Sequence, residues 1–459
     1  MSETNKIYFI GIGGIGMSAI ARYMLSQGKE VYGYDKNETT LTKKLVDEGM
    51  KIHYTDDVNL ISEGMDLVVY TPAIPKGHSE LNHFIDNGYD VIKRAEMLGR
   101  LSLMKKTIAI AGTHGKTSTS ATTAHLLKHG KEDVSAFIGG IMSNYNSNYI
   151  EGSGDWIVVE ADEYDRSFLH LSPDIIAIMS MDADHLDIYG NHNVMIEGFE
   201  AFIMKIKQDG TLIIKEEMLA VLSDGVIEVL AEKNVNVVLF GIETNTEVSV
   251  DNVRVQDGKF FFDYQSENGS INGLQSNLAG RHNIENSTVA ITIATILGMD
   301  GEAVRDGLQS FKGIKRRFET IYEDEHVTYI DDYAHHPTEL RSAIGAAKEL
   351  FPEKKITGIF QPHLFSRTRD FADGFAEALD MLDEVLLLDI YPAREESMEG
   401  ITSKIIFDRL KMDKKTLVTK ETLMDELKNR ELELLMTLGA GDIDTFVAQI
   451  DNFLNVKRT

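Results

Sequence analysis

The chain has 459 residues, too many for one hydrophobic core, so about two to four domains are expected, with three as the central expectation. Its composition, 43% hydrophobic and 26% charged, is typical of a globular protein and excludes a disordered one. A formal net charge of -27 argues against nucleic acid and anionic membranes as partners, and the absence of cysteine excludes disulfides and thiol chemistry.

The first apolar strand, predicted over residues 6–10, runs into a glycine-rich turn. Gly11, Gly13, Gly14 and Gly16 fit a dinucleotide fingerprint, and Asp35 follows Gly16 at the ribose-binding spacing. The pattern predicts a nucleotide pyrophosphate at a helix N-terminus without naming the nucleotide; a tight strand–helix turn without a ligand is the alternative. The polar residues 1–6, and the lack of any apolar run of about 18 residues, predict neither a signal peptide nor a transmembrane helix.

A second strand, predicted over residues 107–111, leads into another glycine-rich loop, composed of Gly112, Thr113, His114, Gly115, Lys116, Thr117 and Ser118. This is a shortened relative of the phosphate-binding loop, in which glycines let backbone amides surround phosphate, lysine reaches the terminal phosphates and a hydroxyl binds Mg²⁺. A helical pattern over residues 119–128 places a helix N-terminus at the same point. A chance match in a surface loop is disfavoured by the flanking strand and helix, so we expect ATP here.

Acidic residues follow the next strands. Glu160 ends an apolar strand over residues 156–160, where ligand sites of open sheets lie, and is a candidate metal ligand. Asp162 and Glu163 follow it, and a solvated acidic turn is the alternative for some of these acids. After a further strand at residues 175–179, His185 is either a metal ligand or a polar loop histidine. Residues 236–278 alternate as short strands with Gly and Asn turns, which predicts an antiparallel insert.

The last part of the chain repeats the strand–turn pattern. A strand over residues 327–330 precedes Asp331, Asp332, His335 and His336, a cluster typical of a metal site, a proton-transfer site or a solvated turn. A strand at residues 356–360 leads to Arg367 and Arg369, which either clamp a carboxylate or phosphate or form a solvated pair. Because helical patterns alternate with strands after each opening strand, we expect parallel α/β domains with boundaries near residues 104 and 313.

Taken in order, the motifs resemble the Mur ligases of bacterial cell-wall synthesis over nearly the whole chain. They lie at residues 11–17 (GIGGIGM), 93–98 (KRAEML), 111–117 (AGTHGKT), 160–163 (EADE), 184–187 (DHLD), 280–286 (GRHNIEN), 316–318 (RRF), 331–339 (DDYAHHPTE) and 361–369 (QPHLFSRTR). The resemblance implies three α/β domains: a Rossmann-like UDP-sugar-binding domain (1–104), a central P-loop ATPase-like domain for ATP and Mg²⁺ (105–313), and a Rossmann-like amino-acid-binding domain (314–459).

The resemblance also implies an activity and site residues. It implies a cytoplasmic, ATP-dependent ligase that joins L-alanine to the carboxylate of UDP-N-acetylmuramate through an acyl phosphate, with Mg²⁺ or Mn²⁺, in peptidoglycan precursor synthesis. The implied UDP-sugar contacts are Gly11, Gly13, Gly14, Gly16, Asp35, Thr71, Pro72, Ala73, Ile74 and Arg94. The implied ATP contacts are the loop from Gly112 to Ser118 together with His282, Asn286 and Arg317. The implied metal ligands are Thr117, Glu160 and His185, the amino-acid contacts Tyr333, His335 and Arg367, and the catalytic residues Lys116, Glu160, His185, Asp332 and His335.

Three competing hypotheses remain at this point. A relative that attaches a tripeptide to the same UDP-sugar in wall recycling is disfavoured by residues 13–16 and 93–96. An NAD-dependent oxidoreductase would use the N-terminal fingerprint and Asp35, but leaves Lys116, Thr117 and Glu160 unexplained. A P-loop ATPase that drives a partner would show ATP hydrolysis without either ligase substrate.

Overall fold

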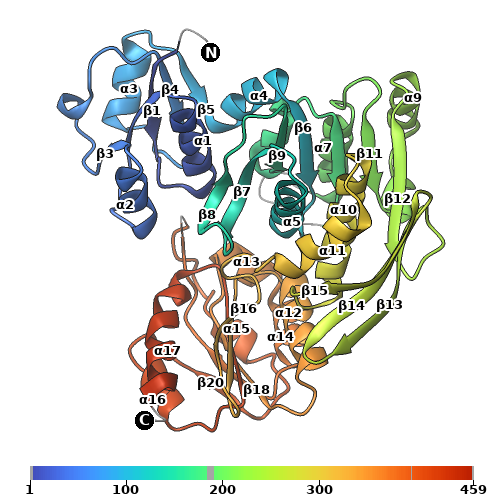
Figure 1. Ribbon diagram of the computed structural model, residues 1–459. Coiled ribbons are helices and arrows are strands. Elements are labelled where there is room, and N and C mark those ends of the chain that lie inside the picture. The colour runs from blue at the N-terminus through green and yellow to red at the C-terminus, as the bar shows by residue number, and fades with distance from the viewer. Residues whose placement is uncertain (1–3, 183–190, 394, 457–459) are drawn as a thin grey trace. The chain divides into compact units, whose positions relative to one another are not determined.

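The structure is a computed structural model that describes residues 4–182, 191–393 and 395–456 (Figure 1). His185, a predicted metal ligand, lies outside the described residues. The chain divides into two compact units, one of residues 1–251, 264–271 and 286–311, and one of residues 252–263, 272–285 and 312–459. Its strands form three sheets.

The first sheet has five strands in the order β3-β2-β1-β4-β5, and all its pairs are parallel. The strands are β1 (Lys6–Ile10), β2 (Glu30–Tyr34), β3 (Lys51–His53), β4 (Leu67–Tyr70) and β5 (Val91–Lys93). The helices are α1 (Ile15–Ser26), α2 (Thr40–Asp47), α3 (Ser79–Asp86) and α4 (Arg94–Met104), with a short 3-10 turn η1 (Val58–Leu60). This strand order is that of the first five strands of a Rossmann sheet, which confirms the predicted fold class.

Both faces of this sheet are buried, as a parallel sheet requires. Successive residues of β1 point to opposite faces: Ile7 and Phe9 join the core that contains α1, whereas Tyr8 and Ile10 join the core that contains Phe84 of α3. The uninterrupted apolar run of β1 therefore reflects two hydrophobic layers, and the following glycine turn is the first point at which the chain can present backbone to a ligand.

The second sheet has ten strands in the order β15-β14-β13-β12-β11-β10-β6-β9-β7-β8. The strands are β6 (Lys106–Ala111), β7 (Ser135–Met142), β8 (Ser147–Ile150), β9 (Trp156–Ala161), β10 (Ile175–Ile178), β11 (Thr211–Ile214), β12 (Asn236–Ile242), β13 (Val248–Gln256), β14 (Lys259–Ser266) and β15 (Gly269–Ser276). Strand β6 pairs in parallel with β9 on one side and β10 on the other. Helix α5 (Lys116–His129) begins directly after the loop that follows β6 and packs on β6, β7 and β9 (Figure 1).

The predicted antiparallel insert is correct in its strands but wrong in its start. The turn between β13 and β14 has Asp257 at φ 51° and Gly258 at φ 70°, as in a two-residue hairpin. Strand β12, however, pairs in parallel with both β11 and β13. Residues 243–247 return the chain along β12, so that β13 begins beside β12 and runs in the same direction. Strand β12 therefore belongs to the parallel part of the sheet, and the hairpins begin after it.

The other helices of this part, among the described residues, are η2 (Tyr164–His170), α7 (His192–Ile203), α8 (Glu216–Leu219), α9 (Asp224–Glu232), α10 (Arg281–Ile296) and α11 (Gly301–Ser310). The third sheet has the order β16-β17-β21-β18-β19-β20 and is parallel except for its edge pair β16–β17. Its strands are β16 (Glu319–Glu323), β17 (Thr328–Asp332), β18 (Ile356–Phe360), β19 (Glu384–Leu387), β20 (Lys415–Leu417) and β21 (Leu434–Leu438). Its helices are α12 (Pro337–Leu350), α13 (Phe365–Asp370), α14 (Ala372–Leu379), α15 (Lys404–Phe407), α16 (Leu423–Lys428), η3 (Asp442–Phe446) and α17 (Val447–Val456).

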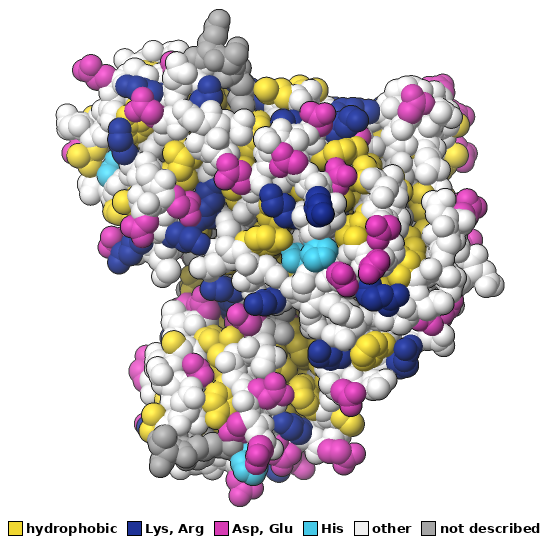
Figure 2. Space-filling model, viewed as in Figure 1, with side chains coloured by type: hydrophobic (Ala, Val, Ile, Leu, Met, Phe, Trp, Pro, Cys, Tyr) yellow, Lys and Arg dark blue, Asp and Glu magenta, His cyan; other side chains and the backbone are white. Residues whose placement is uncertain are grey.

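Acidic and basic side chains are interspersed over the face drawn in Figure 2, so the large negative charge is not gathered into one patch there. Among the described residues, every helix is too short or too polar to cross a membrane.

Candidate functional site

The first glycine loop connects β1 to α1. Gly11 has φ 84°, a left-handed conformation that favours glycine, and its amide donates to the Tyr34 carbonyl at 2.8 Å. The Gly13 amide donates to Asp35 Oδ2 at 2.8 Å. A Cβ at Gly13 would lie 2.6 Å from Thr42 Cγ2 and 2.8 Å from the same Asp35 oxygen. The loop therefore needs glycine at position 13, and the structure places Asp35 against it.

The turn from Thr71 to Ile74 lies against this loop. A Cβ at Gly11 would lie 2.6 Å from Thr71 Cγ2, and the Ile74 amide donates to the Thr71 carbonyl at 3.1 Å, with Pro72 and Ala73 between them. Gly14 donates from its amide to the Gly11 carbonyl at 3.1 Å, which closes the glycine turn. These predicted UDP-sugar residues are thus neighbours in the structure.

Arg94 lies on the other side of the loop. It is the first residue of α4, and a Cβ at Gly16 would lie 2.6 Å from its Nη1 atom. Its Nη2 atom lies 3.3 Å from Asp162 Oδ2, just after β9. The guanidinium therefore stands between the first glycine loop and the acidic segment of the second sheet.

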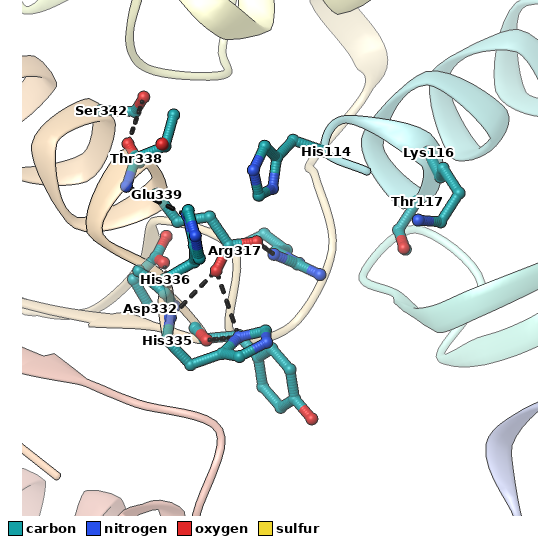
Figure 3. Close-up of polar contacts among 12 residues, drawn as sticks. His114, Lys116, Thr117, Arg317, Asp332, His335, His336, Thr338, Glu339 and Ser342 are labelled. Carbon is teal, nitrogen blue, oxygen red and sulfur yellow. Dashed lines mark hydrogen bonds and ion pairs between the residues drawn. The ribbon is translucent and has the colours of Figure 1, made fainter. Parts of the chain in front are cut away.

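The second glycine loop connects β6 to α5, and Lys116 and Thr117 begin the helix (Figure 3). The Lys116 ammonium donates to the Gly112 carbonyl at 2.5 Å and lies 3.0 and 2.8 Å from the two carboxylate oxygens of Glu163. Burial works against the charged ammonium, but the carboxylates of Glu163, Asp162 and Glu160 outweigh it and raise the pKa of Lys116. The lysine is thus held as a cation at the N-terminus of a helix, where phosphate binds.

Thr117, in the first turn of α5, faces Glu160 of β9. The Thr117 hydroxyl donates to Glu160 Oε1 at 2.9 Å, and the Gly139 amide of β7 donates to Glu160 Oε2 at 2.9 Å. Burial raises the pKa of Glu160, against the opposing effects of Lys116 and Thr117. The set of a hydroxyl and a carboxylate fits Mg²⁺, which prefers oxygen ligands and keeps several waters and substrate phosphates. Among the described residues no group of three or more His, Cys, Asp or Glu forms a complete metal cage.

Other loop residues are fixed by neighbours that the sequence did not indicate. Thr113 Oγ1 lies 2.9 Å from Ser180 Oγ, and the His114 amide donates to the same oxygen at 2.8 Å. Ser180 follows β10, so a polar residue at the end of an apolar strand was the available signal. A Cβ at Gly115 would lie 2.6 Å from Asn286 Oδ1, which places this predicted nucleotide contact against the loop. Ser118 lies in the first turn of α5, where its carbonyl accepts from the Thr122 hydroxyl.

In the other unit, Asp332 ends β17 and holds two turns together. Its carboxylate accepts from the Phe318 amide at 2.6 Å and from the Ala334 amide at 2.7 Å, and burial raises its pKa to about 6. The guanidinium groups of Arg316 and Arg317 each lie 5.2 Å from the centre of the adjacent Tyr333 ring. Such cation–π contacts hold the aromatic ring in place.

His335 lies beside Glu339, an acid of the first turn of α12 that the sequence did not single out (Figure 3). The His335 amide donates to Glu339 Oε2 at 2.9 Å, and its Nδ1 atom lies 3.1 Å from the same oxygen. Arg317 Nη1 is 3.9 Å from the other Glu339 oxygen.

Burial, helped by the Arg317 charge, lowers the pKa of His282 to about 4, which keeps that imidazole neutral. Arg367, on α13, is 9% exposed.

The comparisons with known proteins agree over the full chain. Residues 6–106 match the Mur ligase family, catalytic domain; residues 110–294 match the Mur ligase middle domain; and residues 316–441 match the Mur ligase, glutamate ligase domain. The chain is 45% identical over 460 residues to a UDP-N-acetylmuramate–L-alanine ligase of Flavobacterium johnsoniae, covering 99% of both.

Solved structures give the same result. A UDP-N-acetylmuramate-alanine ligase of Thermotoga maritima matches with a TM-score of 0.81 at 29% identity, covering 98% of this chain and 99% of that one. A murein peptide ligase of Psychrobacter arcticus shares the fold, with a TM-score of 0.69 at 21% identity and 98% of both chains covered.

Proposed function

The chain belongs to the Mur ligase family, and on that premise we propose that it joins L-alanine to UDP-N-acetylmuramate at the expense of ATP, in the cytoplasm, as a step of peptidoglycan precursor synthesis. The observation that carries this proposal is the arrangement at the second glycine loop. Lys116 and Thr117 begin a helix directly after a parallel strand, and Glu160 of the neighbouring strand accepts from Thr117. That arrangement is suited to a triphosphate and a divalent cation.

The reaction must first activate a carboxylate, because an amine that attacked it directly would have to expel oxide. Transfer of the γ-phosphoryl group of ATP to the muramate carboxylate gives an acyl phosphate and ADP. The alanine amine then attacks the acyl carbon, the C–N bond forms, the C–O bond to phosphate breaks, and the amine loses a proton. Negative charge gathers at the phosphoryl group and the oxyanion, and Lys116 is the cation of the loop that offsets it.

Thr117 and Glu160 would hold Mg²⁺, or Mn²⁺, and His185 would contribute at a second metal position. When bound, the metal supplies positive charge that neutralises phosphate oxygens and orients them. The contribution of the chain itself is the pairing of Thr117 with Glu160 at 2.9 Å, which holds both oxygens in place before any ligand arrives.

The other site residues are assigned by substrate. We propose that the first glycine loop, with Asp35, the turn from Thr71 to Ile74 and Arg94, binds the UDP-sugar, because these groups surround one strand–helix turn. His282, Asn286 and Arg317 would contact the ATP base and phosphates. Tyr333, His335 and Arg367 would bind L-alanine, and Asp332, which accepts from the Ala334 amide, would hold the turn that carries Tyr333 and His335. The corresponding domains would be residues 1–104, 105–313 and 314–459.

The test is phosphate release from ATP by the purified full-length chain. With UDP-N-acetylmuramate present, L-alanine should release one phosphate for each amide formed, and either substrate alone should release almost none. A preference for the L-alanine-headed tripeptide would instead indicate the recycling ligase. ATP hydrolysis that is indifferent to both substrates would indicate an ATPase that drives a partner. Binding of NADH would favour the oxidoreductase.

A further inference from the structure

Glu163 is a buried acid at the second glycine loop to which no role has been assigned so far. It follows β9 by two residues, its side chain has no exposed surface, and its carboxylate is within 3.0 Å of the Lys116 ammonium through both oxygens. The ammonium also donates to the Gly112 carbonyl at 2.5 Å and reaches the Thr113 carbonyl at 3.4 Å. A lysine ammonium has only three donors, so all three already have partners. A phosphate can therefore be bound by Lys116 only if one of these contacts is exchanged.

The cost of each exchange decides which contact is given up. Removing the partner of a buried charge is strongly unfavourable, because the remaining charge is left without compensation. Leaving a neutral backbone carbonyl without its donor costs less than leaving a buried charge without its partner. The contacts to Gly112 and Thr113 are therefore the ones that yield to phosphate, and the contact to Glu163 is the one that remains.

We infer that Glu163 is a positioning residue that stays paired with Lys116 when ATP binds and directs its ammonium at the phosphates. The neighbouring acids do not duplicate it. Glu160 accepts from Thr117 and from Gly139, and Asp162 lies against Arg94. Each of these three acids thus holds a different group, and Glu163 is the one paired with the lysine.

The backbone explains why Glu163 points inward. Glu163 is the N-cap residue of the 3-10 helix η2, and its carbonyl accepts from the Arg166 amide at 3.0 Å. The preceding carbonyl, of Asp162, accepts from the Phe168 amide at 3.0 Å, and Phe168 is buried in the core. The segment is therefore anchored on its own turn, and the carboxylate is presented to Lys116 from a fixed base.

The test compares Glu163→Gln, which keeps size but removes the charge, with Glu163→Asp and wild type. The role rests on the proposed use of ATP, so two quantities are measured: the dissociation constant of an unhydrolysable ATP analogue, and kcat for L-alanine-dependent phosphate release. Glu163→Gln should lower kcat by about 100-fold, the effect of a misdirected catalytic group. It should weaken analogue binding and leave KM for the UDP-sugar unchanged. Glu163→Asp, which keeps the charge, should recover part of kcat.

A double-mutant cycle with Lys116→Ala separates positioning from a general structural role. If Glu163 acts through Lys116, adding Glu163→Gln to Lys116→Ala should cause no further loss of kcat, whereas independent effects would multiply. Glu384→Gln is the control, because Glu384 of β19 is an acid only 12% exposed that is likewise ion-paired, with Lys355 at 2.6 Å and Arg430 at 2.8 Å. That control should lower stability without changing analogue affinity.

Two results would overturn the inference. Tighter analogue binding in Glu163→Gln would mean that Glu163 competes with phosphate and releases the lysine. Multiplicative losses in the cycle would mean that Glu163 acts independently of Lys116. Failure of the proposed function itself is recognised separately, since wild type would then release no phosphate with L-alanine while the analogue-binding comparison would still report on Glu163.

Discussion

The two glycine loops of this chain share one local design and differ in their charged neighbours. Each follows a parallel strand and opens a helix, so each presents backbone amides at a helix N-terminus. The first loop contains no lysine, and its amide at Gly13 is held by Asp35. The second contains Lys116 and Thr117, held by Glu163 and Glu160. The same strand–helix turn therefore becomes a binding element or a reaction element according to which side chains stand beside it.

Burial adds a difference in energy to this difference in chemistry. The cation beside the first loop, Arg94, is 23% exposed and lies 3.3 Å from an acid that is 36% exposed. Such a pair contributes about 0–1 kcal/mol and is exchanged easily for a ligand. At the second loop Glu163 is fully buried against Lys116, so the pair cannot be broken without a large cost. Substitutions at the first loop should therefore weaken substrate affinity to different degrees, and substitutions at the second loop should abolish the reaction.

The largest expected effect comes from removing the lysine. Lys116→Ala should lower kcat/KM for ligation by about 1,000-fold or more, since one donor aimed at developing charge supplies about 100- to 1,000-fold and the buried Glu163 is also left unpaired. UDP-N-acetylmuramate should still bind with unchanged affinity, because its proposed loop lies on the first sheet. Phosphate release and calorimetric titration measure the two quantities. Loss of both would mean that the loops do not have separate roles.

Acid should weaken the helix behind the second loop more than the helix behind the first. His125 of α5 is 5% exposed between the Tyr145 hydroxyl at 2.9 Å and Ser310 Oγ at 2.8 Å. Burial, with a contribution from His129, lowers the pKa of His125 from 6.5 to about 4. Between pH 6.5 and about 4, His125 is therefore protonated in the unfolded chain but neutral in the folded chain. The stability present above pH 6.5 is lost as the pH falls to about 4. Helix α1 contains no histidine.

The size of the expected loss in the free energy of unfolding follows from the shift in the pKa of His125. The difference between 6.5 and about 4 is worth roughly 3 kcal/mol at 1.36 kcal/mol for each pH unit. Urea unfolding of wild type and His125→Gln at pH 7 and pH 4.5, followed by hydrogen exchange in α5 and α1, measures it. The variant should show the smaller loss on acidification, and the difference should be confined to α5. Equal losses in the two proteins would exclude His125 as the cause.

The elements that the sequence predicted are those fixed by local physics. The two glycine loops could be placed because residue type restricts backbone conformation, and Glu160 could be placed because carboxyl ends of parallel strands share one sheet edge. The contact of Gly139 with Glu160 could not be predicted, because the Gly139 amide reaches Glu160 only through the pairing of β7 with β9, which is a feature of sheet topology. The inward direction of Glu163 was also inaccessible, because the alternation of strand side chains ends with β9.

The same limit explains the error at β12 and the omission of Glu339. A run of short strands with Gly and Asn turns does not distinguish a parallel partner from an antiparallel one, so the insert was predicted to begin at residue 236. Glu339 contacts His335 because α12 begins at Pro337, and the first turn of this helix lies against the loop that contains His335. Sequence spacing alone gave no reason to choose this acid among many.

The smallest effect is expected at Gly13. Lys116→Ala should impair the reaction and spare UDP-sugar binding, whereas Gly13→Ala should impair UDP-sugar binding. A Cβ there would lie 2.6 Å from Thr42 Cγ2 and 2.8 Å from Asp35 Oδ2, so Gly13→Ala must displace the contact that holds the first loop. Overpacking of this kind costs about 1–3 kcal/mol, which corresponds to a loss of about 5- to 150-fold in affinity for the UDP-sugar. ATP-analogue affinity should not change. Gly77→Ala is the matched control, since a Cβ at Gly77 meets nothing within 4 Å. If Gly13→Ala weakened both ligands equally, the two loops would be one coupled site, and their difference in charge would not divide binding from chemistry.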